Sequence, residues 1–133
     1  MNYASASLAT HAASHYDRRY VIGVLGPTSK TLSLSPSVEE PSYRDTTFTE
    51  MVTSYAEQCR ALLEGGVQVL MVETVFDTLN AKAALFAISS VLEERAAQVP
   101  IFVSSLLHCN LKPYCGKIPD VNFSAPWLPW QHS

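Results

Sequence analysis

Three short stretches of the chain are largely apolar, and each is framed by polar or turn-forming residues. They span residues 20–25, 67–72 and 100–104, and Gln68 is the one polar member of the second. Apolar runs of this length, without alternation of polar and apolar positions, are typical of strands that are covered on both faces of a parallel sheet. We therefore expect three such strands, the first of which is broken off by Gly26-Pro27-Thr28.

Helical patterns fill the intervals between these strands. Residues 3–13 are rich in Ala and Ser, and residues 47–50 form a capping box that opens an amphipathic helix ending at Gly65-Gly66. Asp77 is a plausible N-cap of a third helix. The expected buried face of that helix is Ala81, Ala84, Leu85, Ile88 and Leu92. The alternation of helices and strands indicates a parallel α/β sheet.

Two segments depart from this alternation. Residues 26–46 form a loop of roughly 20 residues, dense in Ser, Pro and Thr, whereas connections usually have about 4–6 residues. Loops of this length in compact domains are often functional. Residues 105–133 show no clear period. We expect them to be an irregular or disordered tail, unrelated to the domain that residues 1–104 form.

Composition and charge narrow the classes of protein to consider. With 47% apolar and 16% charged residues the chain is globular, and its formal charge of −3 provides no basic surface for nucleic acid. No apolar run approaches the about 18 residues of a membrane span, and the N-terminus has no secretion signal. We therefore expect a cytoplasmic protein with no membrane partner, in which Cys59, Cys109 and Cys115 are reduced.

Glu73 is the first candidate for a functional side chain. It follows the second apolar run directly, and ligand groups in parallel α/β folds lie at the C-terminal ends of the strands. A carboxylate there can bind a ligand amine, or it can cap a helix or pair with a lysine. Asp77 is better explained as a helix cap than as a ligand group. Gly26-Pro27-Thr28 ends the first strand at the same edge, and it could also be a simple turn.

Metal-binding patterns are weak in this sequence. His11 and His15 lie four residues apart, but Ala12 stands where a zinc protease motif needs Glu, so a solvated helix face is the better interpretation. Cys109 and Cys115 are separated by five residues, in contrast to the two to four of common structural zinc sites, although His108 and His132 accompany them. We expect no zinc site and no metal ligand in this chain.

The segments 24–28, 34–38 and 73–84 together resemble the homocysteine-binding domain of cobalamin-dependent methionine synthase. The run from Glu73 to Thr78 is the most specific part, and the similarity extends over residues 1–104. Betaine-using homocysteine methyltransferases share the fold but match these segments less well. The resemblance implies a (β/α)8 TIM barrel, of which this chain would hold about strands 3 to 5 with their helices, followed by the irregular tail.

The resemblance also implies a chemistry. In that family, zinc held by three cysteines on later strands activates the homocysteine thiolate. The thiolate takes a methyl group from methylcobalamin, which a separate module holds and methyltetrahydrofolate recharges. By resemblance, Glu73 binds the amino group of homocysteine, and Gly26, Pro27 and Thr28 line the same mouth.

The chain lacks counterparts for much of this machinery. Cys59 lies in an expected helix, while Cys109 and Cys115 lie in the tail, so none matches a zinc cysteine. The cobalamin and folate modules have no counterpart either. We therefore expect a fragment of a methionine synthase, a methyltransferase of methionine biosynthesis, that binds no cofactor, carries no catalytic residue and is inactive alone. The alternatives are a non-catalytic half-barrel interaction protein and the product of a truncated gene model.

An incomplete barrel would leave strand faces without partners. Each aliphatic side chain that is no longer buried lowers the stability of the fold by about 1.5–3 kcal/mol. The isolated chain is therefore expected to be aggregation-prone or molten. A stable monomer would require a cover over the exposed face, for which the tail offers Trp127 and Trp130. The residues expected to face inward are Val21, Gly23 and Leu25 or their alternates, with Val69, Met71, Ile101 and Val103.

Overall fold

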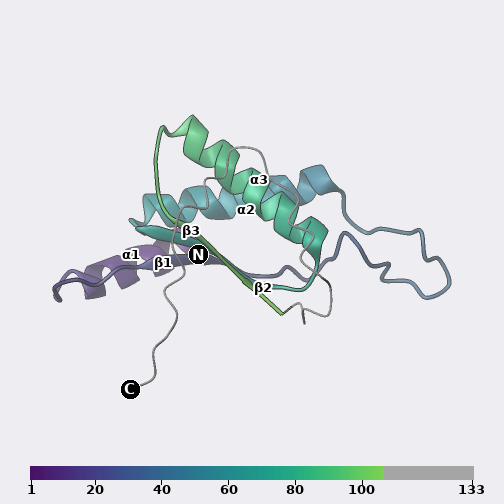
Figure 1. Ribbon diagram of the computed structural model, residues 1–133, viewed down its shortest axis with the longest axis horizontal. Helices are drawn as coiled ribbons and strands as arrows, with labels where there is room; N and C mark the ends of the chain where they lie inside the picture. The colour runs from purple at the N-terminus through teal and green to yellow at the C-terminus, as the bar shows by residue number, and fades with distance from the viewer. Residues whose placement is uncertain (107–133) are drawn as a thin grey trace, which may run out of the picture.

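A computed structural model describes residues 1–106, so the expected tail lies outside the described residues from position 107 onward. Helices and strands alternate along the described part (Figure 1). They are α1 (Asn2–Ala13), β1 (Ile22–Leu25), α2 (Phe48–Glu64), β2 (Val69–Val75), α3 (Thr78–Glu94) and β3 (Ile101–Ser105). The predicted order of elements is confirmed, and β3 ends one residue beyond the expected domain limit at residue 104.

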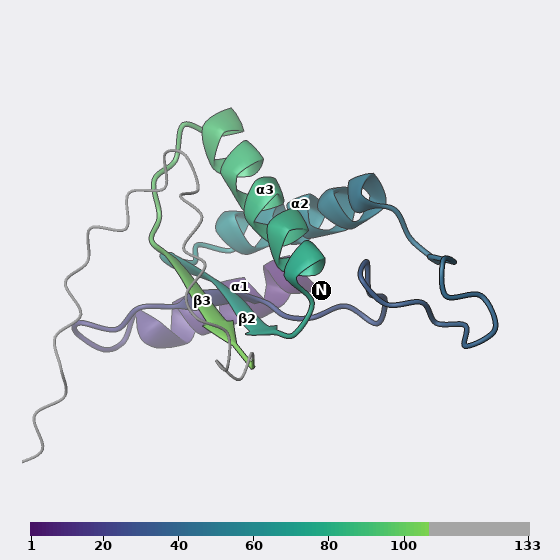
Figure 2. The same ribbon diagram turned by 45° about the vertical axis from the view of Figure 1, so that its right-hand side comes forward.

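The three strands form one parallel sheet in the order β1-β2-β3. Figures 1 and 2 both show α2 and α3 on the same side of this sheet. α1 packs against the C-terminal end of α2, where a side chain at Gly65 would overlap Ala6. These are consecutive β/α units, and their arrangement is compatible with part of a barrel.

The described residues bury only one face of the sheet, as expected for strands of an incomplete barrel. In β1, Gly23 and Leu25 are buried, whereas Ile22 and Val24 keep 44% and 37% of their surface exposed. The reason is that α2 and α3 both pack on the side of Gly23 and Leu25. Apolar runs of this kind are typical of strands with a hydrophobic core on each face of the sheet, but residues 1–106 form a core on one face only.

The strand register determines which side chains share the uncovered face. Val24 lies beside Met71, and Met71 lies beside Phe102. Neighbouring residues of a sheet project to the same side, so Phe102, which is 53% exposed, lies on the face of Ile22 and Val24. We call this surface the open face, and it comprises Ile22, Val24, Met71 and Phe102.

The same register corrects the side chains that were expected to face inward from β3. Ile101 pairs with buried Leu70, and Val103 pairs with buried Val72. Both therefore alternate onto the helix side of the sheet, and Phe102 takes the open side. A register shift of one residue moves every side chain of a strand to the other face of the sheet. Ile101, Phe102 and Val103 are all apolar, so the sequence alone could not show which alternate set of side chains faces the helices.

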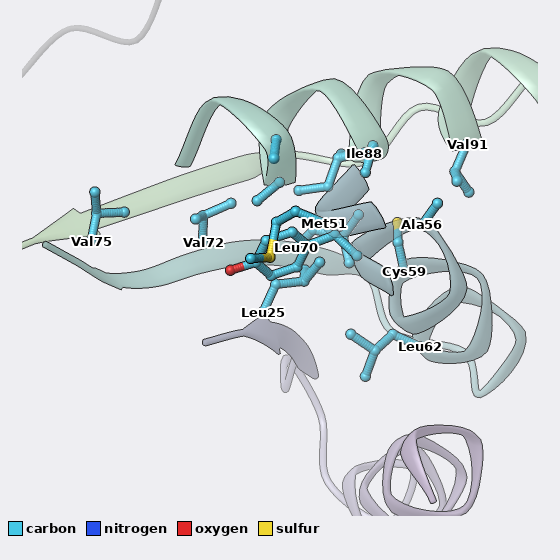
Figure 3. Close-up of a cluster of buried hydrophobic side chains, with 14 of the residues drawn as sticks. Leu25, Met51, Ala56, Cys59, Leu62, Leu70, Val72, Val75, Ile88 and Val91 are labelled. Atoms are coloured by element: carbon cyan, nitrogen blue, oxygen red, sulfur yellow. The ribbon is translucent and has the colours of Figure 1, made fainter. Parts of the chain in front are cut away.

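The hydrophobic core lies between the sheet and the helices α2 and α3 (Figure 3). Leu25 and Leu70 project into it from the sheet, and Cys59 enters it from α2. α3 contributes Ile88 and Val91, which are fully buried. The lone cysteine of the described chain is therefore a core residue.

The buried face of α3 differs in part from the predicted one. Ala84 and Ile88 are buried as predicted, but Ala81, Leu85 and Leu92 are only half-buried. The helix packs against both the sheet and α2. Its fully buried positions therefore include small side chains, which allow these elements to approach closely. The buried positions of α3 are Asn80, Ala83, Ala84, Ala87, Ile88 and Val91.

The predicted start and end of α2 are confirmed. The Thr47 hydroxyl accepts the Glu50 N–H at 3.2 Å, and the Glu50 carboxylate accepts the Thr47 N–H at 2.8 Å. The helix ends at Glu64 with Gly65 as its C-cap, and the next residue, Gly66, adopts a φ of 88°, which glycine allows without strain.

Gly65→Ala is expected to destabilise the fold by about 1–3 kcal/mol, because the new methyl group would overlap Ala6 and press on the Tyr3 carbonyl oxygen of α1. Urea unfolding would measure the change as a lower midpoint. Gly26→Ala is the matched control, since a Cβ at Gly26 meets no atom within 4 Å. Equal midpoints for the two variants would contradict the close packing of α1 on α2.

Candidate functional site

A depression lies at the C-terminal edge of the sheet, where β1 and β2 end. It is shallow and open to solvent, with a cavity volume of about 10 Å³. Gly26 and Pro27 line it from the end of β1, and Glu73 lines it from β2. The structure thus brings together three of the four residues expected to line the substrate mouth, and Thr28 is the exception. The complete lining is Gly26, Pro27, Tyr55, Glu73, Thr74, Val75, Phe76, Asp77, Asn80 and Ala81.

Glu73 lies within β2, which extends three residues beyond the predicted strand. The register to β3 is irregular between Val72 and Val75, and Thr74 in this interval has a φ of 59°. A positive φ is costly for a β-branched residue, and such local strain and bulges occur at binding and active sites. The Thr74 N–H donates to the Ser104 hydroxyl at 3.2 Å, which holds the bulge against β3.

The Glu73 carboxylate is exposed and has no hydrogen bond or ion pair with any residue in the range 1–106. The two structural alternatives for this residue, a helix cap or a lysine partner, are therefore not realised in the described chain. Asp77 is the residue that caps α3. Glu73 is left available to a group from outside the described residues.

Asp77 caps α3 as predicted, and it also fastens the long loop. It is 4% exposed, and its carboxylate accepts the N–H groups of Leu79 and Asn80 at 2.9 and 3.3 Å. The same carboxylate accepts the N–H and the hydroxyl of Ser33 at 2.9 and 2.7 Å. Burial acts to raise the pKa of Asp77, but the hydrogen bonds from Ser33, Asn80 and Leu79 outweigh it and hold the pKa below its usual value.

Asn80 and Arg44 also hold the loop in place, and neither residue was predicted from the sequence. The Asn80 carboxamide accepts the Leu32 N–H at 3.0 Å and donates to the Lys30 carbonyl at 2.9 Å. Arg44 donates to backbone carbonyl groups within the loop. The sequence did hold a signal for this role. Asp77 and Asn80 lie one helical turn apart at the start of α3, and a long loop has backbone polar groups that need hydrogen-bond partners.

Thr28 is bound into this network and does not line the depression. Its hydroxyl donates to the Lys30 carbonyl at 2.6 Å and lies 3.4 Å from the Asn80 amide nitrogen. The neighbouring Gly26 carbonyl accepts the hydroxyl of buried Tyr55 at 3.2 Å. Burial, followed by the charge of Asp77, raises the pKa of Tyr55. Thr28 thus helps to hold the loop, and its expected role at the mouth stays a prediction.

The network predicts a dependence of stability on pH. Because the pKa of Asp77 is lowered in the folded state, its contribution is complete above about pH 4, the range of an unfolded aspartate, and is lost as the pH falls through the folded pKa. Urea midpoints of the wild type should therefore fall steeply below about pH 4. The midpoints of Asp77→Asn should fall less over the same interval, and parallel curves would contradict this role.

The side chains of residues 1–106 do not form a metal site. No group of three or more His, Cys, Asp or Glu is placed to hold an ion in this range. Burial raises the pKa of the Cys59 thiol to about 11, so the thiol is protonated at neutral pH. His11 and His15 are exposed as expected, and although α1 ends at Ala13 their rings meet edge to face with centroids 5.1 Å apart. The candidates His108, Cys109, Cys115 and His132 lie outside the described residues.

The elements around the depression can be compared with known families. None of the helices in the described part is both long and apolar enough to cross a membrane. The family model of homocysteine S-methyltransferase matches residues 1–114, which include all of the described helices and strands and the whole depression. This chain therefore belongs to the homocysteine S-methyltransferase family.

Proposed function

We propose that this chain carries the amine-binding part of the homocysteine site of a methionine synthase, with Glu73 as the residue that binds the substrate ammonium group. Homocysteine is the substrate that the family implies. The finer identity is supported by the similarity of residues 73–84 to cobalamin-dependent methionine synthase. Methionine biosynthesis in the cytoplasm is the setting that this proposal implies.

The unpartnered Glu73 carboxylate is the observation that carries the proposal. Of the two acids that line the depression, Asp77 is saturated by four hydrogen bonds, whereas Glu73 has no partner among residues 1–106. An ammonium group that entered the depression would find one free carboxylate. A charge-assisted hydrogen bond of this kind contributes about 1.5–3 kcal/mol.

The described residues supply recognition rather than activation of the thiol. Methyl transfer requires a thiolate, and the family chemistry implied by the resemblance uses zinc with three cysteine ligands for that step. The described part of this chain does not fit such a site, because Cys59 is its one cysteine and lies in the core. We propose that zinc, methylcobalamin and methyltetrahydrofolate are bound by parts of a methionine synthase other than residues 1–106.

Zinc binding can be tested directly on the whole chain. After dialysis against micromolar zinc, we expect clearly less than one tightly held zinc per chain, because no three-cysteine group matches the family pattern. Metal analysis of the dialysed protein gives the stoichiometry. One retained zinc per chain, lost in the Cys109→Ser/Cys115→Ser variant, would overturn this expectation.

Calorimetric titration of the chain with two thiols tests the proposed function. Homocysteine should bind more tightly than 4-mercaptobutanoate, which has the same thiol and carboxylate but no amino group. The expected difference is about 10- to 150-fold, the value of one charge-assisted hydrogen bond. Equal affinities, or no binding of homocysteine, would refute an amine-binding role for this part of the fold.

A non-catalytic interaction role is the second candidate, and one observation favours it. The open face presents apolar side chains, with Phe102 53% exposed, and such a surface on a soluble domain is typical of an interaction site. Binding of homocysteine with the expected preference for the amine would favour the methyltransferase role over this one.

A further inference from the structure

We propose that residues 107–133 of this chain dock on the open face of its own sheet. On that face Ile22, Val24 and Phe102 are exposed, and Met71 is half-buried. No helix of the described part covers these side chains, since α2 and α3 pack on the opposite side (Figure 2). An apolar surface of this kind gains free energy when other apolar groups exclude water from it.

The place where the described chain ends favours its own continuation as the occupant. The Leu106 N–H donates to the Val75 carbonyl at 3.0 Å, so the chain leaves the C-terminal edge of the sheet held against the end of β2. Residues 107–133 could reach about 90 Å when extended, whereas a strand of the length of β3 spans about 17 Å. The segment is therefore long enough to return along the open face without leaving the molecule.

The sequence of this segment matches the open face in hydrophobicity and charge. It contains both tryptophans of the chain, Trp127 and Trp130, whose side chains can bury a larger apolar area than those of most residues. It also has two lysines, Lys112 and Lys117, against one acid, Asp120. Glu73, two residues beyond Met71 in β2, adds a negative charge at the C-terminal edge of this face, so the net charges of the face and the segment are complementary.

The proposed docking does not follow from membership of the family. Residues 115–133, which include both tryptophans, lie beyond the family match at residues 1–114. Docking would cover the apolar side chains of the open face, and it would therefore prevent the aggregation expected for an incomplete barrel. The inference does not depend on homocysteine binding, and its test uses no substrate.

Intrinsic fluorescence of the full chain tests the docking, because both tryptophans lie in the proposed occupant and neither lies in the described fold. We expect blue-shifted emission, protection from acrylamide quenching, and no change of either with protein concentration. Phe102→Thr should lower the ratio of docked to free segment by about 10-fold or more, which shifts the emission to the red. Threonine retains the preference for a strand.

Phe86→Thr is the matched control, since Phe86 is equally aromatic and 58% exposed but lies on α3. Its emission should equal that of the wild type. Val24→Thr provides an independent variant on β1, should circular dichroism show that Phe102→Thr is unfolded. Solvent-exposed tryptophans in the folded wild type would overturn the proposal. So would protection that appears only at high concentration, which indicates a second copy as the occupant, or unchanged emission in folded Phe102→Thr or Val24→Thr.

Discussion

Replacing Glu73 with alanine is expected to weaken homocysteine binding by about 10- to 150-fold, the equivalent of a lost charge-assisted hydrogen bond of about 1.5–3 kcal/mol. The physical reason is that Glu73 is the one acid of the depression whose oxygens are not already used within residues 1–106. Calorimetric titration of this chain would measure the change. In an intact methyltransferase that contains this segment, the Michaelis constant for homocysteine should rise while the zinc content stays the same.

Two controls separate amine recognition from a general loss of structure. Glu39→Ala removes an exposed carboxylate from the loop and should leave the affinity for homocysteine unchanged. Binding of 4-mercaptobutanoate should be insensitive to Glu73→Ala, because this ligand has no amino group for Glu73 to bind. An equal loss for both ligands would show that Glu73 acts on the fold or on another part of the substrate.

Asp77→Ala is expected to have the largest effect on stability, about 2–4 kcal/mol. The substitution removes the cap of α3 and leaves the N–H of Ser33 and the first amides of the helix without their acceptor. It also releases the loop between β1 and α2 from the start of α3. Urea unfolding followed by circular dichroism measures the loss as a lower midpoint.

Asp45→Ala is the matched control for this change. Asp45 is a carboxylate of the same loop, but its partner Lys30 lies 3.7 Å away and both side chains are partly exposed. Exposed ion pairs contribute about 0–1 kcal/mol, so this variant should unfold near the wild type. If Asp45→Ala and Asp77→Ala lost similar stability, the hydrogen bonds of Asp77 would not be the main fastening of the loop.

The alternation of helices and strands was predictable from the sequence alone because its signals are local. The capping box at residues 47–50 and the cap at Asp77 each depend on residues within one turn of the chain. The short apolar runs indicated parallel strands, and parallel strands place their C-terminal ends at one edge. The position of Glu73 beside Gly26 and Pro27 followed from that geometry.

Only the tertiary structure decided which surfaces of these elements are covered and which polar groups are satisfied. The choice of Phe102 over its neighbours for the open face depends on the register with β2. The fastening of the loop depends on contacts across long separations, such as that of Asn80 with Leu32. A sequence pattern records the preference of each residue for water or for a partner. Which partner each residue meets is decided by contacts between segments far apart in the chain, and those contacts form only when the helices and strands pack together.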